Sequence, residues 1–361
     1  MLKTLLKVIK GKVNKIISLF LGILFQSAIV SAQVVSPFNN LCIKDSSKSY
    51  SFIVSGHFHG ASTNASTFPA SSLLANIDSL NALNPLFLMS LGDMFLDVDD
   101  TYINHYRSSL FSKLKMPLLN AVGNHDLAHN VYEKLYGKTF YSFTHNSELY
   151  IVLNTEMNDG SIKDEQLKLL SNSIDTALTN KIKNVFIFSH RPIWAERIDK
   201  YKKLFSDNTR TAIGNNNFIE EIKPLLQKIS KNKNVYWISG SMGGMAPASF
   251  FYDKEEETNV TYMCTAIRDL PRDAVLRIDF NDDIVSMKGI SLTGQQLLPI
   301  ENYNINYWNK NTAPEQSFNF RLLPYLTKQM LMHHYFWFGF GFCLLLIFCI
   351  SFIRKRWKKR K

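Results

Sequence analysis

Four apolar segments of this 361-residue chain each end in polar side chains that are able to bind a cation. The segments are residues 50–55, 86–91, 116–122 and 184–188, and the loops after them are Gly56-His57-Phe58-His59, Gly92-Asp93, Gly123-Asn124-His125-Asp126 and Ser189-His190-Arg191-Pro192. Short apolar segments bounded by Gly or Pro are typical of buried strands. Ligand sites of α/β sheets lie beyond the carboxyl ends of their strands, so we expect these loops to meet.

Helical spacing separates several of these strands. Apolar residues at Leu73, Leu74, Ile77, Leu80 and Leu83 predict one helix, and others are expected at residues 101–114, 164–178 and 216–229. Further strands are expected at residues 139–143, 149–154, 235–239, 260–265, 274–280 and 284–290. The predicted fold class is therefore α/β, an α+β sandwich of mixed β-sheets flanked by helices.

The N-terminus has the pattern of a secretory signal peptide. Five lysines within residues 3–15 precede the apolar residues 16–30 and the small residues Ser31-Ala32. This order predicts a signal peptide over residues 1–32 that is cleaved after Ala32. An uncleaved signal anchor is the alternative, against which the short apolar segment argues.

A single membrane-spanning helix is expected near the C-terminus. Residues 335–353 carry no charge, and as a helix they would extend about 28 Å, enough for the hydrocarbon core of a bilayer. The basic tail at residues 354–361 indicates a cytoplasmic flank. The prediction is a single-pass type I membrane protein, with the globular part in a periplasm, in a lumen or on a cell surface. Its parts are a lead-in (33–49), one domain (50–308) and a stalk (309–334).

The formal net charge of +11 comes from the two ends of the chain. Of the 41 Lys and Arg residues, 5 lie in residues 1–32 and 7 in residues 333–361, which leaves 29 basic against 30 acidic residues between them. A near-neutral domain gives no electrostatic reason to predict nucleic-acid binding.

Two of the four cysteines, Cys42 and Cys264, lie outside the predicted membrane helix. An oxidising compartment would allow them to form a disulfide. Two buried free thiols would give the same sequence pattern.

The ordered motifs resemble those of the calcineurin-like metallophosphoesterases. That family has D-x-H, G-D, G-N-H-[DE], a lone His after a strand, and G-H-x-H, in this order. The chain has Gly92-Asp93, Gly123-Asn124-His125-Asp126 and Ser189-His190-Arg191-Pro192 in the same order. Residues 141–143, 151–155 and 164–166 are similar as well, and the resemblance covers most of residues 50–292.

The resemblance implies a calcineurin-like metallophosphoesterase fold and a site for two divalent cations (Mn, Fe or Zn). Asp93 would bridge the cations, His57 and His59 would complete one site, and Asn124 and His190 the other. His125 would be the acid that protonates the leaving oxygen, because imidazole ordinarily titrates near neutral pH. Arg191 would contact the phosphate or, equally, cap a neighbouring loop.

The chain departs from the family pattern in three places. His57 replaces the Asp of the first motif, and Gly240-Ser241-Met242-Gly243 replaces G-H-x-H. No His occurs between His190 and His333, so the last two ligands are missing from the sequence. The acidic residue expected three positions after Asp93 is Leu96, which leaves open what orients His125.

Two functions are therefore expected as alternatives. The first is a membrane-anchored, extracytoplasmic phosphoesterase that hydrolyses a phosphomonoester or phosphodiester of a small molecule, lipid or glycan with metal-activated water. The second is a catalytically weakened or inactive phosphoesterase-like domain that binds a ligand or partner at a surface.

Overall fold

The computed structural model describes residues 34–358, apart from residues 45–46, 65, 206–215, 283 and 313–319. The predicted signal peptide at residues 1–32 lies outside the described residues. The described strands form two sheets.

The first sheet has the strand order β11-β10-β1-β2-β3. Its strands are β1 (Tyr50–Ser55), β2 (Leu88–Ser90), β3 (Leu118–Asn120), β10 (Ala274–Asn281) and β11 (Ile284–Ser291). β1, β2 and β3 are parallel neighbours, whereas β10 runs antiparallel to both β1 and β11. The carboxyl ends of three parallel strands therefore lie at one edge of the sheet.

The second sheet has the order β4-β5-β6-β7-β9-β8. Its strands are β4 (Tyr141–His145), β5 (Glu148–Val152), β6 (Asn184–Ser189), β7 (Asn234–Ser239), β8 (Phe250–Glu255) and β9 (Val260–Thr265). The four central strands are parallel, and β4 and β8 pair antiparallel at the edges. Because buried parallel strands are apolar on both faces, β5, β6 and β9 are buried along their whole length.

The two sheets pack face to face through aromatic side chains. Phe52 of β1 lies 5.7 Å from Tyr150 of β5 and 5.3 and 5.9 Å from Phe186 and Phe188 of β6, measured between ring centroids. Successive side chains of a strand point to opposite faces. Accordingly Ile53, next to Phe52, belongs to a different apolar cluster on the outer face of the first sheet.

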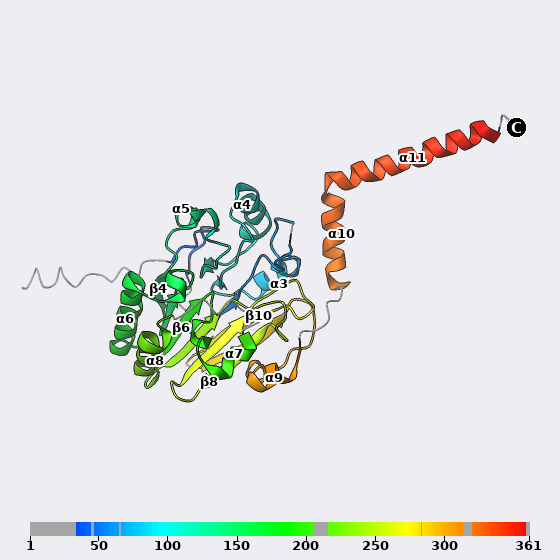
Figure 1. The fold of residues 1–361 in the computed structure, drawn as a ribbon. Helices are drawn as coiled ribbons and strands as arrows, with labels where there is room; N and C mark the ends of the chain where they lie inside the picture. Colours follow the sequence, from blue (N-terminus) through cyan, green and yellow to red (C-terminus); the bar gives the residue numbers. More distant parts are fainter. Residues whose placement is uncertain are drawn as a thin grey trace, which may run out of the picture. The chain divides into compact units, whose positions relative to one another are not determined.

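Helices cover both outer faces, as Figure 1 shows. On the first sheet, Leu73, Ile77 and Ile103 pack with Ile53 and Leu118. On the second, α6 (Asp164–Thr179) and α8 (Lys223–Ser230) contribute apolar residues that include Leu170, Ile174, Leu226 and Ile229. The described helices are α2 (Ser71–Leu74), α3 (Ile77–Ala82), α4 (Asp100–Tyr106), α5 (Tyr132–Tyr136), α6 (Asp164–Thr179), α7 (Asp199–Phe205), α8 (Lys223–Ser230), α9 (Ile305–Lys310), α10 (Leu323–Met332) and α11 (His334–Lys358). The layers confirm the predicted sandwich of mixed sheets flanked by helices.

Some predicted elements differ in detail. The helix expected around Leu73 to Leu83 is two short helices, with a break at Asn76. The Asn76 side chain donates to Ser72 O and Leu292 O, so it bonds to the backbone where the helix breaks. Strand β8 was not predicted, because Asp253 and Glu255 interrupt its apolar pattern. As an edge strand it tolerates these polar side chains.

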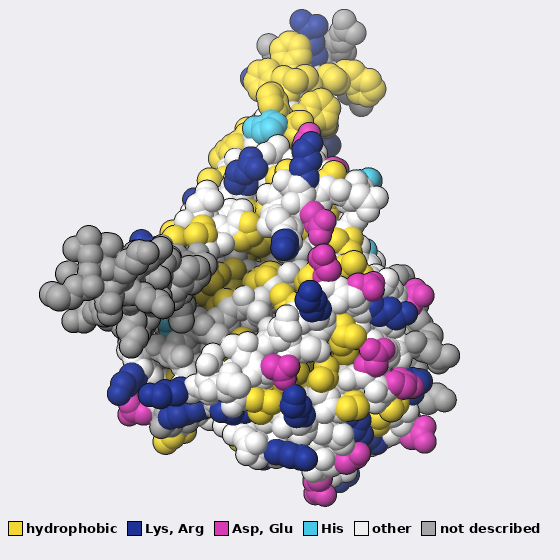
Figure 2. Space-filling model, turned by 90° about the vertical axis from the view of Figure 1, so that its left-hand side faces the viewer, with side chains coloured by type: hydrophobic (Ala, Val, Ile, Leu, Met, Phe, Trp, Pro, Cys, Tyr) yellow, Lys and Arg dark blue, Asp and Glu magenta, His cyan; other side chains and the backbone are white. Residues whose placement is uncertain are grey.

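One helix among the described residues is long and apolar enough to cross a membrane. It extends from His334 to Trp357, and the 18 most apolar consecutive residues within it have a mean hydropathy of 2.5 and are not buried. The predicted apolar helix at the C-terminus is therefore present. Figure 2 shows acidic and basic side chains interspersed over the visible face of the globular part, in keeping with a near-neutral domain.

The possible disulfide between Cys42 and Cys264 is not formed, and both residues are free cysteines. Cys264 is fully buried in β9, and burial raises the pKa of its thiol well above the usual value. Of the two alternatives, the structure has the unpaired thiols.

Candidate metal centre

Three loops of the first sheet meet at the carboxyl ends of its parallel strands. β1 leads to His57 and His59, β2 leads to Asp93, and β3 leads through Gly123 to His125. His125 N donates to Asp93 Oδ1 at 3.2 Å, which ties the third loop to the second. The shared edge of parallel strands therefore gathers the side chains that the motifs singled out.

The second sheet contributes to the same place. β6 leads to His190, and a bridge between Gly56 and Ala266 joins the end of β1 to the end of β9. Gly56 N donates to Thr265 O at 2.9 Å, and Ile267 N donates to Gly56 O at 3.2 Å. The strand ends of the two sheets thus converge on one site.

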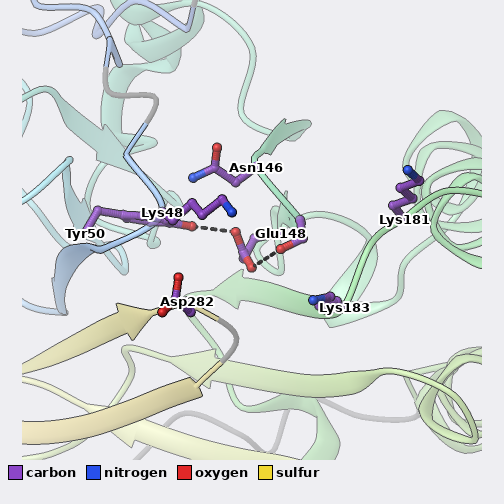
Figure 3. Close-up of a pocket in the computed structure, with 8 residues that line it drawn as sticks. Lys48, Tyr50, Asn146, Glu148, Lys181, Lys183 and Asp282 are labelled. Atoms are coloured by element: carbon purple, nitrogen blue, oxygen red, sulfur yellow. Dashed lines mark hydrogen bonds between the residues drawn. The ribbon is translucent and has the colours of Figure 1, made fainter.

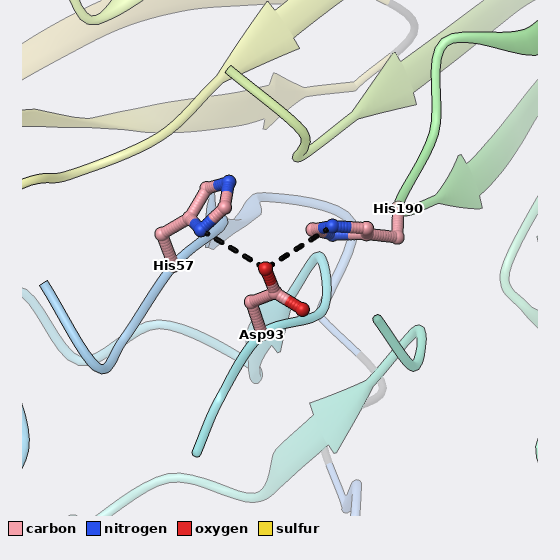
Figure 4. Close-up of side chains that lie close together, drawn as sticks. All are labelled: His57, Asp93 and His190. Atoms are coloured by element: carbon pink, nitrogen blue, oxygen red, sulfur yellow. Dashed lines mark ion pairs between the residues drawn. The ribbon is translucent and has the colours of Figure 1, made fainter. Parts of the chain in front are cut away.

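Asp93 lies at the centre of this site, as Figure 4 shows for two of its partners. Its Oδ2 is 3.3 Å from His57 Nδ1, 3.8 Å from His59 Nε2 and 3.4 Å from His190 Nε2. All four side chains are buried. Asp93 and His57 both have a left-handed backbone, with φ of 52° and 57°. Such strain is uncommon for non-glycine residues and concentrates at functional sites.

The electrostatics follow from burial and from the single carboxylate. Burial disfavours the charged form of Asp93, but the imidazoles, His190 first, outweigh it and hold its pKa well below the usual range. Burial also opposes protonation of His190, yet Asp93 raises its pKa to about 9. Burial, aided by Arg268, lowers the pKa of His57, and burial lowers that of His59. Two neutral imidazoles, the form that binds metals, therefore face one carboxylate.

Two sets of possible ligands share Asp93. His57, Asp93 and His190 form one set, and His59, Asp93 and His125 form the other, each with ligand atoms within 4.8 Å of one another. A carboxylate with imidazoles suits Zn, Fe or Mn, so the residues present fit a divalent cation. The expected division, which pairs His57 with His59 and Asn124 with His190, groups the imidazoles differently and stays a prediction. Asn124 is half-buried in the β3 loop, and its role as a ligand stays a prediction.

His125 is oriented by a backbone carbonyl. Its Nδ1 lies 2.8 Å from Leu96 O, and since a carbonyl only accepts, Nδ1 carries a proton there. Nε2 is then left for a metal or for proton transfer. The family pattern led us to expect an acidic side chain at position 96. In this chain the backbone carbonyl of Leu96 accepts the hydrogen bond from His125 instead. The neighbouring Asp97 pairs instead with the exposed His129, at 2.9 Å.

Asp126 holds the β3 loop in place. Its carboxylate accepts from Gly123 N at 2.9 Å, Phe95 N at 3.0 Å and Asn120 Nδ2 at 3.2 Å. Burial, with the nearby Asp93, raises its pKa to about 6 despite these bonds. It therefore joins the loops that carry Asp93 and His125 and has a structural role.

Arg191 is already paired. Its guanidinium donates to both carboxylate oxygens of Glu156, with Nε at 2.7 and 2.8 Å, and Nη2 also contacts Glu156. Both side chains are almost fully buried. A guanidinium paired with a carboxylate in this way is closer to the structural role expected for Arg191, capping a neighbouring loop, than to a free phosphate contact. The phosphate contact of Arg191 stays a prediction.

The segment that replaces G-H-x-H packs against the first motif. Met242 is buried, and its N–H lies 3.4 Å from His57 Nε2. Arg268, which follows β9, donates from Nε to Met242 O at 2.9 Å and has Nη2 3.0 Å from His57 Nε2. Sequence reasoning missed Arg268, although the rule that loops after strands carry site residues, applied to residues 260–265, would have found it.

A separate hollow of about 470 Å³ is lined by Lys48, Tyr50, Asn146, Ser147, Glu148, Lys181, Lys183 and Asp282, as Figure 3 shows. It includes the first residues of β1 and β5, the ends of these strands opposite to the loops described above. Its buried acid, Glu148, already accepts hydrogen bonds from Tyr50 Oη at 2.7 Å and Asn184 Nδ2 at 3.2 Å. We regard this hollow as structural.

Comparisons with known proteins gave matches among solved structures alone. No protein-family model matches the chain, and no curated protein matches its sequence. A dimetal phosphatase from Danio rerio is 12% identical, covering 67% of this chain and 96% of its own, with a TM-score of 0.47. GAP50, the anchor in the inner membrane complex of Plasmodium, is 11% identical, covering 74% and 95%, with a TM-score of 0.48. A predicted phosphoesterase from Streptococcus pneumoniae is 10% identical, covering 68% and 90%, with a TM-score of 0.29.

The order of the motifs and the path of the chain agree with each other. Two mixed sheets pack face to face under helices, and the loops after β1, β2, β3 and β6 carry the motifs in the expected order. These loops bring Asp93 together with His57, His59 and His190. The chain has the calcineurin-like metallophosphoesterase fold.

Proposed function

We propose that the protein is a metal-dependent phosphoesterase that hydrolyses a phosphomonoester or a phosphodiester. The observation that carries this proposal is the buried Asp93 carboxylate, with His57, His59 and His190 at 3.3, 3.8 and 3.4 Å. Divalent cations held by such groups neutralise phosphoryl oxygens and lower the pKa of a water molecule. These four side chains are buried, and burial strengthens such electrostatic effects.

We further propose that α11 anchors the protein in a membrane as a single-pass type I helix, with the globular part outside the cytoplasm. The apolar span and the basic residues that follow it support this orientation. A phosphoester of a small molecule, a lipid or a glycan would reach the site from the periplasm, the lumen or the cell surface.

Metal content and ester hydrolysis test the proposed activity. The full chain, purified in detergent, is stripped with a chelator and reloaded with Mn²⁺, Fe²⁺ or Zn²⁺. We expect hydrolysis of p-nitrophenyl phosphate or bis-p-nitrophenyl phosphate that disappears with the metal and returns on reloading. A folded chain that binds none of these metals and hydrolyses neither ester would refute the proposal.

A second candidate function is a phosphoesterase-like domain that binds a ligand or partner without efficient turnover. The observation that favours it is the replacement of G-H-x-H by Gly240-Ser241-Met242-Gly243, which offers no side-chain imidazole at the site. Metal binding without hydrolysis of either ester would select this alternative over the first.

His125 gives a test of how the leaving oxygen is protonated. Replacing His125 with alanine should lower kcat/KM for phenyl phosphate by about 100-fold or more, the usual contribution of a general acid. Hydrolysis of p-nitrophenyl phosphate should fall much less, because p-nitrophenolate leaves without a proton.

The matched control is His129→Ala, since His129 is exposed and pairs with Asp97. This variant should hydrolyse both esters as the unmodified chain does. Equal losses for the two esters in His125→Ala would contradict the role of His125 as the acid.

A further inference from the structure

Arg268 places a guanidinium inside the candidate metal centre. It follows β9 and is half-buried, and its backbone N–H donates to the buried Asp273 carboxylate at 2.9 Å. Its side chain is fixed by two further contacts, from Nε to Met242 O and from Nη2 to His57 Nε2. The position of this cation is therefore set by the fold.

The guanidinium of Arg268 has no carboxylate partner. Among the residues that the structure describes, no ion pair involves Arg268, and Nη1 has no hydrogen-bond partner. The contrast is Arg191, whose charge is matched by Glu156. Burial lowers the pKa of Arg268, and Asp93 and Asp273 offset this only in part, from beyond ion-pair distance. Arg268 is therefore suited to an anion that enters the site from outside the chain.

Arg268 also determines how His57 is protonated. A guanidinium only donates hydrogen bonds, so His57 Nε2 must accept. The proton of the neutral ring is then on Nδ1, which lies 3.3 Å from Asp93 Oδ2 and can donate to it. Binding of a metal at Nδ1 would place the ring proton on Nε2, against the N–H groups of Arg268. In this position Arg268 therefore opposes metal binding by His57.

His190 has the opposite arrangement. Its Nδ1 donates to Leu91 O at 2.8 Å, and its Nε2 faces Asp93 Oδ2 at 3.4 Å. His125 is oriented in the same way by Leu96 O. The surroundings of His57, by contrast, already contain the fixed positive charge of Arg268.

We propose that Arg268 takes the place of the second cation, so that the site binds one divalent metal and the guanidinium binds the oxygens of the substrate's phosphoryl group. This inference rests on the proposed phosphoesterase function and specifies how the site binds its substrate. A guanidinium can hold two phosphoryl oxygens with its planar fork, and it supplies charge where a second metal would.

Metal stoichiometry tests the inference directly. The full chain in detergent is titrated with Mn²⁺ alone, and one equivalent is expected to bind. In Arg268→Ala, His57 Nε2 is released and the fixed charge is gone, so binding should rise to two equivalents. The control Arg197→Ala removes an exposed arginine paired with Glu220 and should keep one equivalent. Binding of two equivalents of Mn²⁺ by the unmodified chain would overturn this inference but not the proposed function. Binding of no Mn²⁺ would overturn both.

Phosphate binding gives a second readout. With one equivalent of Mn²⁺ bound, Arg268→Ala should bind inorganic phosphate about 10- to 100-fold more weakly, the loss expected for a hydrogen bond to a charged group. Arg268→Lys keeps the charge but not the fork, so its loss should be smaller, and it serves as the test if the alanine variant does not fold. Unchanged phosphate affinity in either folded variant would overturn the inference.

Discussion

Replacing Asp93 with alanine is expected to abolish metal binding and, with it, ester hydrolysis. Asp93 belongs to both sets of possible ligands and supplies the only carboxylate in either of them. Without it, a divalent cation would face neutral imidazoles and the guanidinium of Arg268. We expect the affinity for Mn²⁺ to fall by about 1,000-fold or more, equivalent to at least ~4 kcal/mol.

The same variant should change the titration of His190. Burial alone would lower the pKa of His190. The Asp93 carboxylate outweighs this effect and raises the pKa of His190 to about 9. In metal-free Asp93→Ala the pKa of His190 should therefore fall below 9, which NMR of the imidazole protons can follow.

Asp97→Ala is the matched control for Asp93→Ala. Asp97 lies four residues further along the chain, has a side chain that is 43% exposed, and pairs with His129. Its loss should leave Mn²⁺ affinity and hydrolysis unchanged, because an exposed ion pair contributes little. Stoichiometric Mn²⁺ bound with unchanged affinity in Asp93→Ala would contradict the central role of this carboxylate.

The sequence contained enough information to predict which loops meet. Apolar runs that end at His57, Asp93, His125 and His190 specify buried strands, and the ends of parallel strands share an edge. This rule needs no knowledge of distant contacts. The helix at Asp164–Thr179 was predictable for a similar local reason, because its apolar residues recur at helical spacing on one face.

The orientation of the individual imidazoles was not predictable in this way. Which nitrogen of His57 faces Asp93 depends on Arg268 and Met242, which are 211 and 185 residues away along the chain. The orientation of His125 depends on the carbonyl of Leu96, and a backbone group leaves no mark in the sequence. Local patterns therefore indicate where the site lies, whereas the orientation of its imidazoles depends on contacts between residues far apart in the sequence.

Gly240 matches the glycine of the family's G-H-x-H motif, although the two histidines of that motif are absent from this chain. A Cβ at Gly240 would lie 2.1 Å from Leu91 O and 2.4 Å from Leu91 Cβ, and a Cβ at Gly56 would lie 2.6 Å from Gly240 O. The strand ends of the two sheets approach each other here without room for a side chain. Glycine is therefore required by the backbone, independently of any metal ligand.

We accordingly expect Gly240→Ala to lower the free energy of unfolding by about 1–3 kcal/mol, because backbone atoms must move to admit the methyl group. Leu91 O is also the acceptor for His190 Nδ1, and Leu91 precedes Gly92-Asp93. Its displacement moves two groups of the site, so Mn²⁺ affinity should fall by roughly 10- to 100-fold. Chemical denaturation followed by tryptophan fluorescence and Mn²⁺ titration measure the two effects.

Gly244→Ala, in the same loop, separates close packing from a general effect of losing glycine. No atom lies within 4 Å of a Cβ placed at Gly244, and its φ is not in the left-handed region. The added methyl group should leave the free energy of unfolding unchanged or raise it slightly, since alanine restricts the unfolded chain. Mn²⁺ affinity should not change. If Gly240→Ala matched Gly244→Ala in both measurements, the close approach of the two sheets at Leu91 would not be what positions Asp93 and His190.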